Sequence, residues 1–157
     1  MSKVPSSTNR ISERFRIRLT ELVINDESSI VDFSKKVKIS LSVINNAIRF
    51  GIIPSLRILI KIADNFEISL TYLLGLDNDN NFIPSVLNET FIERFDQLKK
   101  ERNLKESQIA NVMPFTRNFI SEWRRNNTLP SLDYLSALAY YFKVSIDYLL
   151  GRTDYKN

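Results

Sequence analysis

The chain carries the stretch PSLRILIKIADNFEISLTYLLG at residues 54–75 and, 76 residues later, the related stretch PSLDYLSALAYYFKVSIDYLLG at residues 130–151. The same offset, without a gap, gives 16 identities among the 63 pairs that start with Phe15 and end with Asp77. An internal repeat of this kind indicates two copies of one folding unit. In a chain of 157 residues, each copy has room for roughly 65 to 70 residues, enough for a small helical core.

The amino-acid composition excludes many classes of function. The chain has neither Cys nor His, which excludes disulfide frameworks, thiol and histidine catalysis and nearly all zinc sites. Lys and Arg outnumber Asp and Glu by 22 to 18, a small excess that is compatible with nucleic-acid binding. No apolar run approaches a membrane span, and Met1 to Arg10 lacks the apolar core of a signal peptide. We therefore expect a soluble cytoplasmic protein that is not an enzyme, with no metal, cofactor, membrane partner or small-molecule substrate.

The spacing of apolar and capping residues predicts five short helices in each copy. In the first helix the apolar side chains recur at helical spacing as Phe15, Leu19 and Leu22, and again as Phe91, Phe95 and Leu98. The predicted N-caps are Ser29 for a second helix, Ser40 and Thr116 for a third, Ser55 and Ser131 for a fourth, and Ser69 and Ser145 for a fifth. Gly75 and Gly151 are predicted to end the fifth helix in the left-handed conformation. No stretch alternates with period two, so we expect an all-α fold without strands.

The repeat also sets the expected domain boundaries. Residues 1–10 are polar and are expected to form a disordered tail. A first domain is expected over residues 11–76, and a second over 87–154. Between them, residues 77–86 contain an Asp- and Asn-rich run followed by Pro84, which is typical of a linker.

Several further residues occupy the positions expected for a helix-turn-helix. In the second copy they are the run from Leu98 to Leu104, then Ile109-Ala110, Met113, Phe115, Ile120 and Trp123. In the first copy they are Phe33, Ser34, Val37, Ile39, Ile44 and Ala47. With these residues the chain resembles the helix-turn-helix family of phage λ repressor and Cro proteins, the xenobiotic response element family. The resemblance implies two tandem five-helix domains of the λ-repressor type.

The same resemblance implies that the third helix of each copy lies in the DNA major groove, with its outward residues at base edges. In the first copy the base-edge candidates are Ser40, Leu41, Ser42, Asn45 and Asn46. In the second copy they are Thr116, Arg117, Asn118, Ser121 and Glu122. The second set suits hydrogen-bond readout, because Arg pairs with guanine, Asn with adenine and Glu with cytosine. Trp123 is expected to pack in the core and not to stack on a base.

Phosphate contacts are expected to differ between the copies. Between Asp32 and Asp64 the first copy has six cations and no acid. Lys61 is one of them, and the other five are phosphate candidates: Lys35, Lys36, Lys38, Arg49 and Arg57. The candidates in the second copy are Arg124, Arg125, Asn126 and Asn127. Because phosphate contacts supply affinity and base contacts supply sequence, we expect the first copy to hold DNA and the second to read it.

The sequence also departs from the family pattern. The second helix opens with Ile30 or Glu106, where the family often has a Gln that binds a phosphate. Lys38 and Pro114 hold the turn position that favours glycine, so both turns are expected to have adjusted geometry. Lys99 and Arg124 occupy positions where many family members have an Arg–Glu pair. Because two cations would meet there, Arg124 is expected to turn outward.

The sequence thus predicts a DNA-binding transcriptional regulator of bacterial or phage origin, acting as a repressor on double-stranded DNA of the nucleoid. A homodimer or a partner regulator is a further expected partner, and at least one of Tyr140 and Tyr141 is expected to be exposed at such an interface. The alternative is a protein-interaction or dimerisation module in which one or both copies no longer bind DNA. Glu106, Ile30 and Leu41 favour that alternative.

Overall fold

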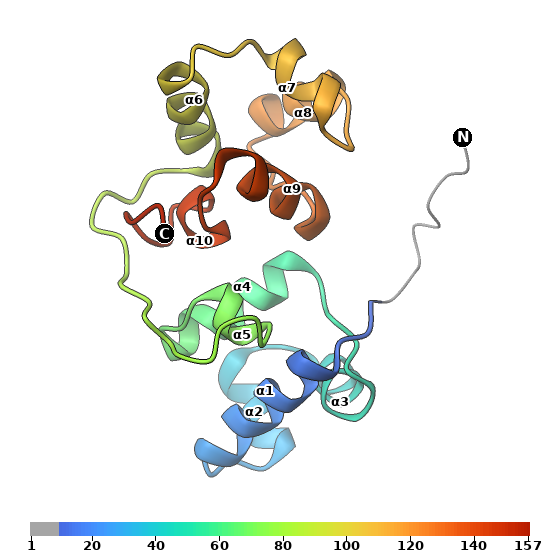
Figure 1. The fold of residues 1–157 in the computed structure, drawn as a ribbon. Coiled ribbons are helices and arrows are strands. Elements are labelled where there is room, and N and C mark those ends of the chain that lie inside the picture. The colour runs from blue at the N-terminus through green and yellow to red at the C-terminus, as the bar shows by residue number, and fades with distance from the viewer. Residues whose placement is uncertain (1–9) are drawn as a thin grey trace. The chain divides into compact units, whose positions relative to one another are not determined.

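The computed structural model describes residues 10–157, and every regular element in this range is an α-helix (Figure 1). The predicted all-α class is confirmed. A single isolated β-bridge joins Ile11 and Ile52. The chain divides into two compact units, with the boundary between Asn81 and Phe82. The predicted disordered tail, residues 1–10, lies outside the described residues except for Arg10.

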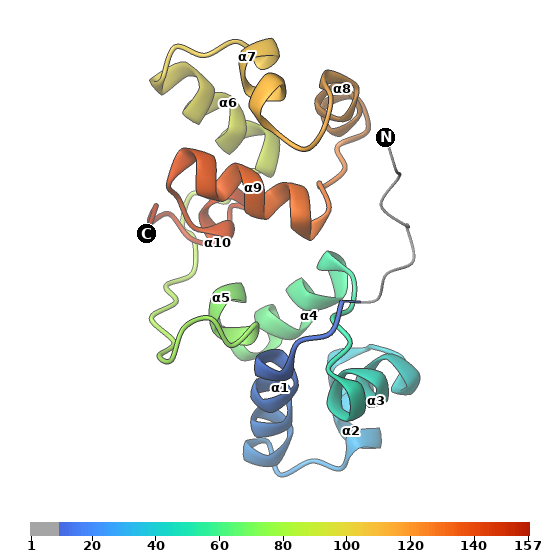
Figure 2. The ribbon, with the colours of Figure 1, turned by 45° about the vertical axis from the view of Figure 1, so that its right-hand side comes forward.

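Each unit has five helices among its described residues. The first unit contains α1 (Glu13–Asn25), α2 (Ile30–Val37), α3 (Leu41–Phe50), α4 (Leu56–Phe66) and α5 (Leu70–Leu73). The second contains α6 (Phe91–Glu101), α7 (Glu106–Val112), α8 (Arg117–Asn126), α9 (Leu132–Phe142) and α10 (Ile146–Leu149). In the first unit α3 lies against α1 and α2 (Figure 2). In the second, α7 contacts α8, and α10 contacts α6 and α9.

The predicted caps lie at the helix starts. Ser29, Ser69, Ser131 and Ser145 each accept a hydrogen bond from the backbone N–H three residues on. Ser40, Ser55 and Thr116 occupy N-cap positions without a side-chain cap bond. Gly75 and Gly151 have φ of +74° and +73°, as predicted. A Cβ on Gly151 would lie 1.8 Å from the carbonyl oxygen of Glu89, so only glycine fits this turn.

Aromatic side chains dominate the core of the second unit. The ring of Trp123 makes edge contacts with Phe91 and Phe115, at centroid distances of 5.7 and 4.9 Å. With 3% of its surface exposed, Trp123 has the packing role that the sequence predicted. The first unit has the small Ala47 at the equivalent position, and its main ring contact is the stack of Phe33 on Phe66 at 5.6 Å. Of the three apolar side chains noted at helical spacing in the first helix, α1 buries Phe15 and Leu19 and leaves Leu22 half-exposed, with Val23 buried beside it.

Both ends of the predicted linker, residues 77–86, are hydrogen-bonded to a unit. In the first unit the Thr71 hydroxyl donates to Asp77 at 2.6 Å, and the Asn80 amide donates to the Glu67 carbonyl at 3.2 Å. In the second unit Asp154 accepts hydrogen bonds from the Ser85 hydroxyl at 2.5 Å and from the backbone N–H of Val86 at 2.8 Å. Each unit therefore begins or ends with an anchored segment.

Candidate nucleic-acid interface

The turn between α2 and α3 contains a lysine in a backbone conformation that favours glycine. Lys38 has φ +57° and ψ +47°, in the left-handed region. Its N–H donates to the Lys35 carbonyl at 3.3 Å, and the N–H of Ile39 donates to the Ser34 carbonyl at 3.1 Å. The buried hydroxyl of Ser34 donates back to the Ile39 carbonyl at 2.5 Å. The predicted adjustment of this turn is therefore wrong, because these bonds hold Lys38 in the conformation that glycine would adopt.

The turn between α7 and α8 has a different geometry. Pro114 has its φ locked by its ring and lacks an N–H. The preceding residue, Met113, is extended with φ −102° and ψ 157°, and none of residues 112–116 has a positive φ. Met113 donates its N–H to the Ala110 carbonyl at 3.3 Å. In this unit the predicted adjustment of the turn is confirmed.

The third helix of the first unit directs a small polar face outward. Ile44 and Ala47 point into the core, which leaves the other side of α3 exposed. Its base-edge candidates are exposed except for Asn45, which is half-buried: Ser40, Leu41, Ser42, Asn45 and Asn46. The hydroxyls of Ser40 and Ser42 lie 3.4 Å apart.

The base-edge candidates on the third helix of the second unit include longer side chains. Ile120 and Trp123 are buried, and all five candidates are exposed: Thr116, Arg117, Asn118, Ser121 and Glu122. No side-chain hydrogen bond or ion pair ties these five to other described residues. Their donors and acceptors are therefore available to a ligand.

Phe119 belongs to the same surface but was not predicted from the sequence. It is 38% exposed and makes an edge contact with Tyr134 at a centroid distance of 5.1 Å. Its first-unit counterpart is Val43, so the repeat gave no signal for an aromatic residue here. An exposed apolar side chain beside the polar base-edge candidates can contact the methyl group of thymine.

Cations of the first unit surround its helix-turn-helix. Five of them are exposed and make no side-chain hydrogen bond or ion pair with other described residues: Lys35, Lys38, Arg49, Arg57 and Lys61. Lys36, the sixth, forms an ion pair with Asp26 and lies 5.2 Å from the centroid of the Phe66 ring. The Lys36 hydrogen bond lowers the pKa of Asp26. Lys36 is thus less available to a phosphate than its five neighbours.

Arg124 does not turn outward as predicted. Its guanidinium donates to both carboxylate oxygens of Asp96, at 2.8 and 2.9 Å, and to Glu106 at 2.6 Å. Lys99 lies 3.2 Å from the same Glu106 oxygen and 3.5 Å from Asp96. The sequence argument considered only the two cations, whereas two carboxylates lie between them. This cluster of Arg124, Lys99, Asp96 and Glu106 ties α8 to α6 and α7.

The charges of this cluster support one another. Hydrogen bonds from Arg124 lower the pKa of Asp96, and those to Asp96 raise the pKa of Arg124. Burial raises the pKa of Glu106, but hydrogen bonds from Arg124 and Lys99 outweigh it and lower that pKa overall. Asp96, Glu106 and Arg124 are therefore charged at neutral pH. Of the other phosphate candidates, Arg125, Asn126 and Asn127 are exposed, and Asn127 ends α8 with φ +50°.

Residues 10–157 contain neither a cluster of metal ligands nor a membrane-spanning helix. No group of three or more acidic residues in this part of the chain could hold a metal ion. None of its helices is long and apolar enough to cross a membrane.

Comparison with known proteins adds a partial likeness to transcriptional regulators. The chain is 33% identical over 61 residues to the helix-turn-helix-type transcriptional activator BcrR of Enterococcus faecalis. The matched segment covers 39% of this chain and 30% of that protein. The chain is also 33% identical over 64 residues to the uncharacterized helix-turn-helix-type transcriptional regulator YobD of Bacillus subtilis strain 168, covering 41% and 57%. The chain is similar to helix-turn-helix regulators. It spans less than two thirds of the length of either relative. No protein-family model and no solved structure matches it.

Proposed function

We propose that this protein is a sequence-specific DNA-binding transcriptional regulator built from two tandem λ-repressor-like helix-turn-helix domains. The observation that carries the proposal is the outward face of α8, where Arg117, Asn118, Ser121 and Glu122 are exposed without internal partners. Such a face matches the hydrogen-bonding groups of base edges in the major groove. The helix-turn-helix regulators that share part of this sequence support the same function.

The first unit supplies most of the affinity in this proposal. Its five unpaired cations lie on α2, the turn, α3 and α4, and each can contact a phosphate. On α8 of the second unit, Arg117 is a base-edge candidate and Arg124 is held by Asp96 and Glu106, which leaves Arg125 as the cation for a phosphate. The first unit thus holds the DNA backbone while the second reads bases.

Linking the two units makes the second binding event intramolecular, which raises its effective concentration. We infer that the protein acts by occupying an operator and so works as a repressor. This mode of action needs no catalytic group and no cofactor.

A titration with random-sequence duplex DNA at two salt concentrations tests DNA binding. The variant Lys35→Glu plus Lys38→Glu should weaken binding and make it less salt-dependent, because each lost phosphate contact reduces the log–log slope by about 0.9. Lys100→Glu plus Lys143→Glu is the matched control, since it makes the same charge change at two exposed lysines of the second unit that lie outside α7 and α8. Equal effects of the two pairs would contradict a phosphate role for the first unit.

The alternative function is a protein-interaction or dimerisation module that has lost DNA binding. Glu106, the first residue of α7, favours this alternative because it forms ion pairs with Arg124 and Lys99. Leu41 also favours it, because this apolar residue is 39% exposed on α3. The same titration separates the two functions. A protein that binds no DNA at low salt would be an interaction module.

Selection of bound sequences from a random DNA pool tests readout. Arg117→Ala should relax the selected sequence at one base position and cost about 1 to 3 kcal/mol of discrimination there. Arg57→Ala is the control, because losing a phosphate contact weakens binding to all sequences alike. A variant pool identical to the wild-type pool would remove Arg117 from the reading surface.

A further inference from the structure

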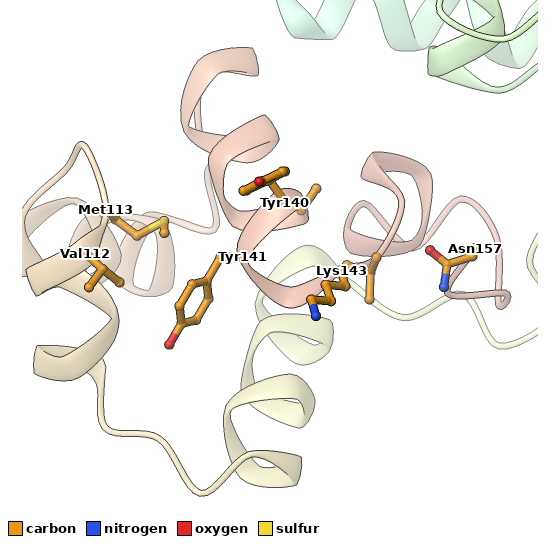
Figure 3. A pocket seen from close by; sticks show the side chains of 8 residues that line it. Val112, Met113, Tyr140, Tyr141, Lys143 and Asn157 are labelled. Carbon is orange, nitrogen blue, oxygen red and sulfur yellow. The ribbon is translucent and has the colours of Figure 1, made fainter.

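The second unit has an apolar pocket beside the end of α7, and none of its lining residues belongs to α8. Its volume is about 660 Å³, and Figure 3 shows its lining side chains. Val112 and Met113 come from the end of α7, Tyr140 and Tyr141 from α9, and Lys143 and Val144 from the segment after α9. A pocket of this size is within the range that binds small molecules.

The repeat provides an internal comparison for this pocket. At the equivalent positions the first unit has polar or charged residues: Lys36 for Val112, Asp64 for Tyr140, Asn65 for Tyr141 and Glu67 for Lys143. There the Asn65 amide donates to the Lys36 carbonyl at 3.4 Å, which bridges α4 and α2. The second unit keeps a charge only at Lys143, and it exposes Tyr140 to 89% and Val112 to 61%. The two units therefore have the same helices here but expose different side chains.

The charges around the pocket favour an anion. Lys143 lines it and makes no ion pair with any described residue. Arg102, which donates to the Tyr141 and Phe142 carbonyls, adds a second positive charge, whereas Glu101 is paired with Lys156. A second copy of this chain would bring the same cations to the same face. The charge pattern therefore points to an anionic occupant and not to self-association.

We propose that this pocket binds a small amphipathic carboxylate. The apolar part of such a molecule would lie against Val112, Met113 and Val144, with the aromatic side chains at its rim. Its carboxylate would pair with the ammonium group of Lys143. The site includes no residue of α8, and an occupant would contact Val112 and Met113, which lead directly into the turn before α8.

Titration of the isotope-labelled full chain with 4-phenylbutyrate, followed by amide chemical shifts, tests the proposal without DNA. We expect saturable shifts confined to the end of α7, the end of α9 and the segment after it. The neutral 4-phenylbutanol should bind more weakly. Lys143→Gln should weaken phenylbutyrate binding by about fivefold, the effect of losing one exposed ion pair, and leave phenylbutanol binding unchanged. Dispersed amide spectra would verify that each variant is folded.

Two matched variants complete the test. Lys100→Gln removes an exposed cation that does not line the pocket and should leave binding unchanged. Val112→Ser should weaken both probes because it removes an apolar wall. The proposal is overturned if the acid and the alcohol bind equally, if the shifts map elsewhere, or if only an acidic peptide binds. It is also overturned if the chain forms a dimer that Tyr140→Glu dissociates, because a second copy would then cover this face.

Discussion

Arg94 lies over the ring of Tyr148, with 4.3 Å between the guanidinium carbon and the ring centroid. Arg18 lies over Tyr72 in the same way at 3.7 Å in the first unit. All four residues are identities of the repeat, and each pair joins the first helix of a unit to its fifth. The repeat has therefore kept a cation–π contact that closes each helical unit.

The two arginines are predicted to differ in their contribution to stability. Arg94 is 1% exposed, lies 2.7 Å from an Asp154 oxygen and has its Nε 2.8 Å from a Glu89 oxygen. Arg94→Met should lower the free energy of unfolding of the second unit by about 3 kcal/mol, because both carboxylates lose their cation. Arg18→Met should cost the first unit about 1 kcal/mol, mainly from the cation–π contact. Chemical denaturation followed by amide spectra resolves both units, and equal losses would contradict this difference.

Acid should destabilise the second unit through Asp154. Hydrogen bonds from the Ser85 hydroxyl and the Val86 N–H, with smaller help from Arg94, lower the pKa of Asp154 to about 2 from an ordinary 3.8. Because the folded pKa is the lower one, the stabilisation is present above pH 4 and is lost as pH falls toward 2. Trp123, the only tryptophan, lies in the second unit and reports its urea midpoint by fluorescence. Asp154→Asn should lower that midpoint at pH 7 and reduce its fall between pH 4 and 2.

The features predicted correctly from the sequence are those that neighbouring residues determine. Ser29 and Ser145 cap their helices, and Gly151 ends α10, through bonds that span at most a few residues. The direction of Arg124 was not predictable in this way, because it depends on Asp96 and Glu106, which are 28 and 18 residues away in the sequence. The all-α class and the core role of Trp123 followed from patterning, whereas the charge cluster required the packing of α8 on α6 and α7.

Lys38→Gly in the turn of the first unit is predicted to have opposite effects on stability and on DNA affinity. Replacing this left-handed lysine by glycine should stabilise the first unit by about 0.5 to 1 kcal/mol, because glycine adopts a positive φ without strain. The same change removes a phosphate candidate and should weaken DNA binding. Amide hydrogen exchange at Ile44 measures the first effect and the duplex titration the second. If stability and affinity fell together, the turn would need Lys38 for its structure.

Ser34 is the matched test of that turn. Its hydroxyl is the donor to the Ile39 carbonyl, and the second unit has Ala110 at the same position. Ser34→Ala should cost the first unit about 1 to 2 kcal/mol, since a buried acceptor loses its side-chain donor. Amide hydrogen exchange across α2 and α3 would detect the loss. Unchanged protection would show that the backbone bond from Ile39 to Ser34 holds the turn alone.

Under the proposed function, the Arg124 cluster should limit how strongly the second unit binds DNA. The double variant Asp96→Asn plus Glu106→Gln removes two negative charges and frees the Arg124 guanidinium to reach a phosphate. DNA affinity at low salt should rise, and the log–log salt slope should steepen by about 0.9 for one added contact. Adding Arg124→Gln to that double variant should abolish the steeper slope, because the freed guanidinium is then gone. If the slope steepened equally with and without Arg124, the gain would come from removing the carboxylates alone, and Arg124 would serve only to position α8 against α6 and α7.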